Sequence, residues 1–226
     1  LNDMIIPDPV SALDYIAAGY SRPNPEQFKT IAIMEGTSSR CTAFVHSRQS
    51  GVSTAIIASA VFYAVKNDHK TVALISHDYL DTSRQILDCL EFIWGPMAGG
   101  LVYESQKRLI RFVNGSYIKI ISARANMLSQ FRGWGINRLY ADVNIFNTDW
   151  MAVMQGVLPT IASTNGKMFF FFTATNAGDR SHKFWMQFRP QDRHVIERKL
   201  SIPEENRLIQ TIGYHAFKRE YQCKFI

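Results

Sequence analysis

The stretch that decides the fold is TAFVHSRQSGVSTAIIASAVFYAVKNDHKTVALIS, residues 42–76. It opens with an apolar run from Thr42 to His46 and continues with a helical stretch, rich in alanine, isoleucine and valine, from about Ser53 to Lys66. A second strand-like run extends from Thr71 to Ser76. A strand, a helix and a strand in this order predict a βαβ unit, whose two strands lie parallel in one sheet.

Another helix and a hairpin follow this unit. Asp78 is a suitable N-cap for a helix that Gly95 and Pro96 end, and the apolar residues between them fall on roughly one face. Beyond it, the alternating runs Leu109 to Val113 and Tyr117 to Ile121 flank an Asn-Gly pair. Asn-Gly between two such runs is a strong hairpin signal, so we expect a β-hairpin insertion here.

The remaining elements indicate the class of the sheet. We expect a strand from about Arg138 to Asp142, a helix from about Trp150 to Leu158, and a strand from Met168 to Thr175. The uninterrupted apolar runs Val72 to Ile75 and Met168 to Phe172 suit central strands that are covered on both faces. The sequence therefore predicts an α/β fold with three layers and a mainly parallel sheet.

Composition excludes several classes of protein. The chain has 226 residues, of which 46% are hydrophobic and 15 are phenylalanine, so it is globular and long enough for one large domain. No apolar stretch is long enough to span a bilayer, and the N-terminus shows no secretory signal. The three widely spaced cysteines indicate reduced thiols in an intracellular compartment, with no disulfide or zinc framework.

Positive charge is concentrated near the C-terminus. The net charge is +6, and residues 180–226 contain ten basic against five acidic side chains, so they hold +5 of it. Such a balance favours polyanionic partners, but a solvated surface with a basic bias explains it equally well.

In a parallel α/β sheet, ligands bind at the carboxyl ends of the strands, so the turns there are the first candidates for a site. The first turn, HSRQSGVST, begins at His46. A phosphate-binding loop is normally written Gly-x-x-x-x-Gly-Lys-Ser/Thr, and here Gly51 and Ser53 match it, whereas His46 replaces the first glycine and Val52 replaces the lysine. Two of four fixed positions match, and the alternative is an ordinary strand-turn-helix junction.

Two further turns carry polar side chains. Asp142 ends a predicted strand, where a carboxylate can bind the Mg²⁺ of a nucleotide, but Val143 follows it where a glutamate would normally orient the attacking water. The third turn, TATNAG, could sense a γ-phosphate through its hydroxyl and amide side chains, or it could simply end the strand with Asn176 as a turn former.

Taken in order, five motifs resemble one family, the ATPase domain of the large terminase subunit, which is the DNA-packaging motor of tailed bacteriophages with relatives in herpesviruses. They are SRQSGVST (47–54), FVNGSYI (112–118), FRG (131–133) before a strand that ends in Asp142 with Phe146 beyond it, TATNAG (173–178) and FKREYQCKF (217–225). The resemblance implies a P-loop NTPase fold of the ASCE or RecA-like type over about residues 20–226.

The resemblance also implies roles for individual residues. The variant Walker A loop and its flanks would bind the nucleotide through Ser47, Arg48, Gln49, Ser50, Gly51, Val52, Ser53 and Thr54. Gln27 would read the adenine, unless it is only a polar helix residue. Asp142 would be the Walker B aspartate, would bind Mg²⁺ together with Ser53, and would be catalytic together with Arg48. Thr173, Ala174, Thr175 and Asn176 would form the coupling motif, and Arg132 is either functional or part of a structural salt bridge.

Two positions depart from the family pattern, because Val52 stands where most relatives have lysine and Val143 where they have glutamate. Arg48 could replace the missing cation. Nothing obvious replaces the glutamate, because Asp149 lies seven residues beyond Asp142, on the expected next helix, where we do not expect it to reach the γ-phosphate. The leading hypothesis is a motor that couples MgATP hydrolysis to translocation of double-stranded DNA into a procapsid. The alternatives are a degenerate domain that binds DNA or portal without hydrolysing ATP, and a helicase or other translocase on the same core.

The resemblance further implies partners and boundaries. The expected partners are double-stranded DNA, the portal protein, the small terminase subunit and further copies of the chain in a ring on the portal, in the host cytoplasm and without a membrane. We expect a single domain with a lead-in over residues 1–25, a nucleotide-binding core over 26–178 and a basic segment over 179–226 that leads to an absent nuclease domain. Because no acidic cluster could hold two metals, we expect no nuclease activity in this chain.

Overall fold

A computed structural model of the chain describes residues 24–76, 79–94, 98–106, 108–122, 131, 133–142 and 150–226. Several residues on which the sequence predictions rest lie outside these described residues. They are the N-terminal lead-in up to residue 23, Asp78, Gly95, Pro96, Arg132, Val143, Phe146 and Asp149.

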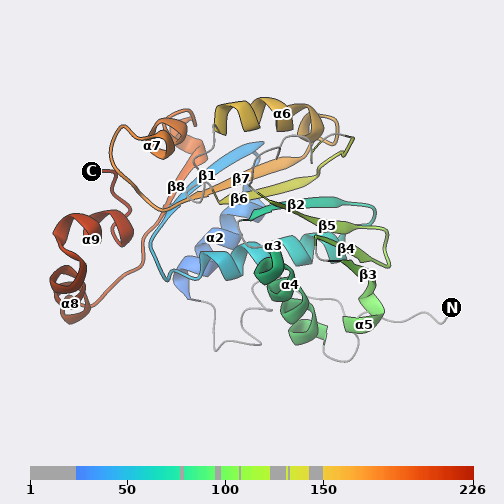
Figure 1. The fold of residues 1–226 in the computed structure, drawn as a ribbon, viewed down its shortest axis with the longest axis horizontal. Helices are drawn as coiled ribbons and strands as arrows, with labels where there is room; N and C mark the ends of the chain where they lie inside the picture. Colours follow the sequence, from blue (N-terminus) through green and yellow to red (C-terminus); the bar gives the residue numbers. More distant parts are fainter. Residues whose placement is uncertain are drawn as a thin grey trace.

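An eight-stranded sheet runs through the centre of the molecule in the order β3-β4-β5-β2-β6-β7-β1-β8 (Figure 1). The pairings β3–β4 and β4–β5 are antiparallel, and all the other pairings are parallel. The strands are β1 (Cys41–His46), β2 (Thr71–Ser76), β3 (Val102–Gln106), β4 (Leu109–Phe112), β5 (Tyr117–Ser122), β6 (Arg138–Asp142), β7 (Lys167–Phe172) and β8 (Arg193–Ile196). The predicted mainly parallel sheet with a hairpin insertion is confirmed.

Helices cover both faces of the sheet, which gives the three predicted layers (Figure 1). One face carries α2 (Pro25–Gly36), α3 (Val52–Lys66) and α4 (Tyr79–Trp94), with the short α5 (Ala98–Leu101) near its edge. The other face carries α6 (Trp150–Ala162) and α7 (Arg180–Trp185). A 3₁₀ turn, η3 (Pro190–Asp192), precedes β8, and α8 (Ile202–Ile212) and α9 (Tyr214–Glu220) lie at one end of the molecule.

Strand β7 shows why an unbroken apolar run belongs in the middle of this sheet. Phe169 and Phe171 pack into the core cluster under α2, α3 and α4, whereas Phe170 and Phe172 pack into the cluster under α6 and α7. All four side chains are at most 1% exposed. Because successive side chains of a strand point to opposite faces, a strand that is covered on both faces must be apolar at every position.

The predicted elements differ from the observed ones mainly at their ends. Helix α6 continues beyond Leu158 to Ala162, because Val157 and Ile161 are both fully buried against the sheet and their burial outweighs the local cost of Pro159. Strand β7 ends at Phe172, three residues before the predicted end at Thr175. Sequence reasoning did not predict β3, β8 or the helices of the basic segment. Among the described residues, none of the helices combines the length and apolarity that a bilayer crossing needs.

The Asn-Gly hairpin turn is attached to the end of α3. The side-chain Nδ2 of Asn114 donates to the carbonyl oxygens of Ala64 and Val65, at 2.9 Å each. These are carbonyls of the last helical turn, which have no partner within the helix. Asn114 therefore caps α3 and fixes the hairpin to it.

A half-buried ion pair joins α2 to the amino end of β6. The guanidinium of Arg138 donates to both carboxylate oxygens of Glu35, at 2.6 and 2.8 Å, and its Cζ lies 3.9 Å from the ring centroid of Tyr63. The Arg138 side chain is 8% exposed and that of Glu35 is 47% exposed. Burial alone would raise the pKa of Glu35, but the hydrogen bonds and charge of Arg138 lower it below its ordinary value of 4.5.

We expect Glu35→Gln to destabilise the fold, because it leaves the buried Arg138 guanidinium without its counter-charge. Since Glu35 is half exposed, the loss should fall in the lower part of the range of about 1–3 kcal/mol for such groups. A carboxylate whose folded pKa is lowered stabilises the fold above its ordinary pKa and loses this effect as the pH falls through the folded value. Urea unfolding should therefore show a wild-type advantage that is constant above about pH 5 and shrinks below about pH 4. The exposed Glu91→Gln variant is the control, and a difference that did not depend on pH would contradict this assignment.

Candidate functional site

The turns predicted to carry chemistry meet at the carboxyl edge of three neighbouring strands. In the sheet register, Phe44 of β1 pairs with Phe171 of β7, and Phe171 pairs with Asp142 of β6. The residues that follow β1 and β7 and the last residue of β6 therefore lie at one edge of the sheet. This is the edge at which parallel α/β sheets bind their ligands.

Residues 47–51, which we call the β1–α3 loop, have a backbone suited to binding an anion. Gln49 and Gly51 have left-handed φ values of 57° and 73°. Left-handed residues in such a loop turn successive N–H groups towards one side, as in the anion-binding concavities known as nests. In the part of the chain that the structure describes, the N–H groups from Gln49 to Thr54 donate no backbone hydrogen bond.

Helix α3 begins directly after this loop with its amino end uncapped. Gly51 is its N-cap, and no side chain caps the helix. The first N–H groups of a helix have no partner within it and carry a partial positive charge, so this end favours an anion. Ser53 in the first turn is exposed and Thr54 is half-buried. The loop and helix together thus offer donors and a hydroxyl without a competing cap.

The amino end of helix α2 contacts the β1–α3 loop. Asn24 and Gln27 form a capping box at the start of α2, and each also donates to the loop: Asn24 Nδ2 to the Ser50 carbonyl at 3.2 Å, and Gln27 Nε2 to the Gly51 carbonyl at 3.4 Å. Gln27 is only 8% exposed. Gln27, the residue predicted to read the adenine, thus lies against the loop. In this conformation its side-chain amide donates to the Gly51 carbonyl. Asn24 was not predicted, although the Asn-Pro-Glu-Gln capping box is visible in the sequence.

Ser47 is fully buried and tethers the loop to the last part of the chain. Its hydroxyl donates to the Tyr221 carbonyl at 2.6 Å and accepts from the Arg198 N–H at 2.9 Å. It also lies 3.4 Å from the Sγ of Cys223, whose pKa burial raises to about 11, so this sulfur is a neutral thiol. The main-chain N–H of Ser47 donates to Ile196. We therefore expect Ser47 to position the loop without contacting a ligand.

Arg48 is the exposed cation of the loop, and it is paired with a carboxylate. Its Nε lies 3.2 Å from Glu220 Oε2, and its main-chain N–H donates to the Glu220 carbonyl at 2.7 Å. The Arg48 side chain is 61% exposed. The next residue, Gln49, accepts from Arg198 at 3.2 Å. Sequence reasoning found Arg48 but missed Glu220, because only the folded chain brings α9 next to the loop.

Neither residue that departs from the phosphate-loop pattern offers a positive charge. Val52 is 2% exposed and belongs to the core cluster under α2, α3 and α4. His46 is half-buried at the end of β1, and desolvation lowers the pKa of its imidazole, which is therefore neutral at pH 7. Ser50 is also buried, and its hydroxyl donates to the Ser47 carbonyl at 2.7 Å. The main-chain N–H groups of Ser50 and Val52 donate no backbone hydrogen bond, so they remain as donors for a ligand.

The residues predicted to form the coupling motif follow β7 and are tied to the same C-terminal part of the chain. Asn176 Oδ1 accepts a short hydrogen bond from Arg219, and the N–H of Ala177 donates to the Ile226 carbonyl at 3.0 Å. Ala174 is buried, and the buried Oγ1 of Thr175 has no hydrogen-bond partner in the described structure. Thr173, at the start of this turn, also has an interaction partner.

Adjacent residues of α9 therefore contact the two candidate loops. Arg219 binds Asn176 in the turn after β7, and Glu220 binds Arg48 in the β1–α3 loop. We call residues 214–226, which comprise α9 and the residues after it, the C-terminal segment. It lies next to α8 at one end of the sheet (Figure 1). Any movement of this segment changes the surroundings of both loops.

Asp142 is the last residue of β6, and only its backbone lies within the described structure. Its main chain is two strands away from β1, at the same edge as the β1–α3 loop. Among the described residues, no three His, Cys, Asp or Glu side chains form a cluster that could hold a metal ion. A metal bound here would need oxygen atoms from elsewhere, such as those of a nucleotide.

Comparison with known proteins finds likeness at the level of fold. No protein-family model matches the sequence, and no curated protein is similar to it. Among solved structures, the large terminase ATPase domain of Thermus phage P74-26 matches with a TM-score of 0.62 and 17% identity, over 91% of this chain and 99% of that chain. The HK97 bacteriophage large terminase matches with a TM-score of 0.62 and 12% identity, over 88% of this chain and 50% of that chain.

The large terminase of a thermophilic bacteriophage in complex with ADP also matches, with a TM-score of 0.65 and 10% identity, over 89% of this chain and 53% of that chain. The chain thus spans about half the length of these last two proteins. The predicted three-layer fold with a mainly parallel sheet is therefore confirmed, and it is the fold of large terminase ATPase domains.

We expect Gly51→Ala to destabilise the chain, because Gly51 has φ +73° and an added Cβ would lie 2.6 Å from Gln27 Nε2. The strained backbone alone should cost about 1–3 kcal/mol in the free energy of unfolding. Part of the loss comes from the clash with the Gln27 side chain, so Gly51→Ala should lower the free energy of unfolding by less in a Gln27→Ala background. Urea unfolding of the four proteins of this double-mutant cycle measures the difference. Gly36→Ala is the matched control, because nothing lies within 4 Å of its added Cβ. Equal losses at Gly51 and Gly36 would contradict the strained loop.

Proposed function

We propose that the chain is the ATPase motor domain of a viral large terminase subunit, which couples MgATP hydrolysis to translocation of double-stranded DNA into a procapsid. The observation that carries the proposal is the β1–α3 loop, where left-handed Gln49 and Gly51 precede an uncapped helix at the carboxyl edge of the sheet. The fold it shares with terminase ATPase domains supports the same conclusion. One of the terminases of this fold was solved in complex with ADP.

The β1–α3 loop would bind the phosphates mainly through its backbone. The N–H groups from Gln49 to Thr54 are the donors, and the positive end of α3 adds to their attraction for an anion. Because these groups are held by the fold, they stabilise charge on the transferred phosphoryl group without reorganising. This contribution does not depend on the lysine that Val52 replaces.

Magnesium fits the residues at this edge. The exposed Ser53 hydroxyl and the carboxylate of Asp142 are hard oxygen ligands, which Mg²⁺ prefers, and both come from elements that end or begin at this edge. When bound, Mg²⁺ neutralises charge on the β- and γ-phosphates. The protein's own part is to hold the phosphates on the loop and to keep a hydroxyl and a carboxylate near them.

Arg48 would act as the cation of the loop. It is exposed and follows Ser47, which is fixed by buried hydrogen bonds, so its backbone position is well defined. To reach a phosphate, its guanidinium has to exchange Glu220 for the ligand. A charge-assisted hydrogen bond to phosphate is stronger than an exposed ion pair, so this exchange is favourable when a nucleotide is present.

One observation favours a second function, a degenerate nucleotide-binding fold that serves as a DNA-binding or assembly module. The Val52 side chain is part of the buried core, so at this position the chain has an apolar packing residue in place of a phosphate-binding cation. A lysine there would have to bury its ammonium or reach out past the loop. Hydrolysis of MgATP separates the two functions, because the degenerate module binds DNA or portal without hydrolysing ATP; a chain that did not bind MgATP at all would also be such a module.

The proposed partners follow from charge and fold. Double-stranded DNA would contact the basic part of the chain, residues 180–226, in a sequence-independent way that weakens steeply with salt. The portal protein, the small terminase subunit and further copies of the chain in a ring are proposed on the same grounds as the motor role. Packaging with purified portal and procapsids, with and without Asp142→Ala, tests this role, and full packaging by that variant would exclude it.

We expect MgATP to bind the purified chain and Arg48→Ala to weaken this binding by about tenfold or more, since a hydrogen bond from a charged group contributes about 1.5–3 kcal/mol. Isothermal calorimetry measures both affinities without requiring a ring. Arg207→Ala on α8 removes the same charge from an exposed site elsewhere and should bind as the unmodified chain does. If the unmodified chain bound no MgATP, the degenerate module would be the correct function.

We expect Glu220→Gln to strengthen MgATP binding, because it removes the carboxylate that competes for Arg48. Exposed ion pairs are worth at most about 1 kcal/mol, so the gain should not exceed about fivefold. Calorimetry with the double variant Arg48→Ala, Glu220→Gln should show no such gain, and Glu205→Gln on α8 is the control for lost charge. Weaker binding by Glu220→Gln would mean that Glu220 holds Arg48 in its working position.

A further inference from the structure

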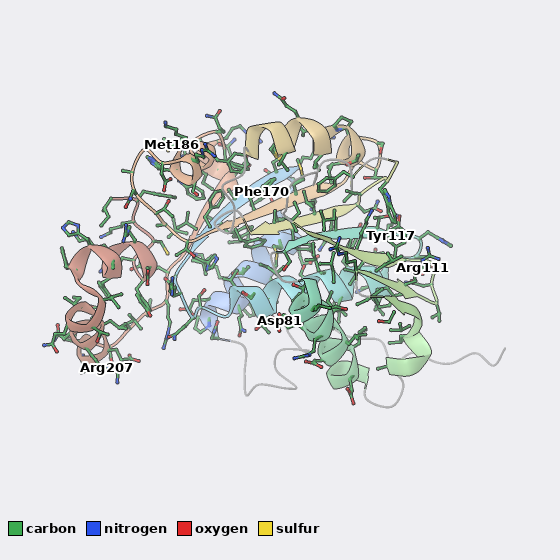
Figure 2. The ribbon with its side chains drawn as sticks, in the orientation of Figure 1. Asp81, Arg111, Tyr117, Phe170, Met186 and Arg207 are labelled. Atoms are coloured by element: carbon green, nitrogen blue, oxygen red, sulfur yellow. The ribbon has the colours of Figure 1, made fainter. Side chains whose placement is uncertain are left out.

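The edge strand β8 brings a second arginine to the β1–α3 loop. Strands β1 and β8 are parallel and His46 pairs with Ile196, so both strands end at the carboxyl edge of the sheet. Two residues beyond β8, the N–H of Arg198 donates to the buried Ser47 hydroxyl at 2.9 Å. The chain then continues into α8, which carries the labelled Arg207 in Figure 2. The main chain of Arg198 is therefore fixed beside the first residue of the loop.

The side chain of Arg198 also contacts the loop. Its Nη1 donates to Gln49 Oε1 at 3.2 Å. Gln49 is one of the two left-handed residues of the loop, and its main-chain N–H donates no backbone hydrogen bond. Because Arg48 directly precedes Gln49, two arginines flank this donor. One belongs to the loop itself, and the other comes from the segment after β8.

The guanidinium of Arg198 keeps N–H donors for a ligand. A guanidinium has several N–H groups in a planar fork, and within the described residues that of Arg198 makes one hydrogen bond, to Gln49. Its Nη2 lies 3.8 Å from Glu204 Oε1, which is an ion pair but too long for a hydrogen bond. The side chains of Arg198 and Glu204 are 32% and 40% exposed, so solvent weakens this pair. The remaining N–H groups are therefore available to an anion on the loop.

Each of the two arginines has a carboxylate partner from the C-terminal helices. Glu204 of α8 lies near Arg198, and Glu220 of α9 contacts Arg48. Phosphate oxygens accept two parallel hydrogen bonds from one guanidinium, a geometry that neither ion pair has here. A polyphosphate on the loop also has more negative charge than one carboxylate. Exchange of both carboxylates for phosphate is therefore favourable.

We infer that Arg198 binds the phosphates of the nucleotide and supplies the positive charge that Val52 removes from the loop. The inference rests on the proposed ATPase function and deepens it, because it adds a residue from outside the loop to the same site. Val52 is buried, so a second cation at the loop has to come from another part of the chain. Arg198 is already held there through its main chain and through Gln49.

The test is calorimetric titration of the full chain with MgATP and, separately, with magnesium tripolyphosphate, which has the phosphates without the nucleoside. Arg198→Ala should weaken the binding of both ligands by about tenfold, because this is the contribution of a hydrogen bond from a charged group. The variant keeps the main-chain N–H that donates to Ser47, so the loop keeps this support. Unchanged MgATP affinity would overturn the inference and leave the proposed ATPase function intact.

Arg40→Ala is the matched control. Its guanidinium also donates to a side-chain amide oxygen at 3.2 Å, that of Asn165, but Arg40 precedes β1 at the amino edge of the sheet. This variant should bind both ligands as the unmodified chain does. Circular dichroism checks the fold of each variant, and Arg198→Gln, which keeps a polar side chain, serves if the alanine variant is unstable.

Two further outcomes would count against the inference. A loss of affinity for MgATP without a loss for tripolyphosphate would place Arg198 at the nucleoside and not at the phosphates. If the unmodified chain bound no MgATP, the proposed ATPase function would fail and the inference with it. These results are distinguishable from an unchanged MgATP affinity in Arg198→Ala, which refutes the role of Arg198 alone.

Discussion

The buried hydroxyl of Ser47 is the interaction on which the candidate site depends. It lies at the end of β1, donates to Tyr221 and accepts from Arg198, and thus joins the first strand to two segments from the far end of the chain. A buried hydroxyl that makes both bonds is well satisfied, whereas loss of either partner would leave a costly unpaired group. The position at which the loop leaves β1 is therefore held by contacts with Tyr221 of the C-terminal segment and with Arg198.

The C-terminal segment contacts both candidate loops at the carboxyl edge of the sheet. Arg219 contacts the turn after β7, and Glu220 contacts Arg48 in the β1–α3 loop. A ligand that takes Arg48 from Glu220 changes a contact of α9 on one side, while Arg219 still ties α9 to the other loop. Both contacts are exposed ion pairs or hydrogen bonds, weak enough individually to be exchanged. The buried Ser47 bonds, by contrast, act as the fixed point.

Helix α3 connects this site to the hairpin turn at the other end of the sheet. It begins at the candidate phosphate loop and ends at carbonyls capped by Asn114, and its 15 residues span about 22 Å. The helix is buried along most of its length, so it acts as a rigid spacer between the two ends.

The sequence by itself determined the sheet apart from its two edge strands, β3 and β8, and it determined the location of the candidate loops, because apolar runs, the Asn-Gly pair and strand-ending polar residues are local signals. The strands Thr71–Ser76 and Arg138–Asp142 and the hairpin follow from them directly. Only the tertiary structure decided which loop residues are exposed. Ser47 belongs to the motif that resembles a phosphate loop and Val52 replaces its lysine, yet both are buried, whereas Arg48 is exposed. It also decided that Glu220 meets Arg48 and that Trp134 meets Lys119. Such pairings join residues distant in sequence, and no local pattern encodes them, because they depend on how the sheet orders its strands.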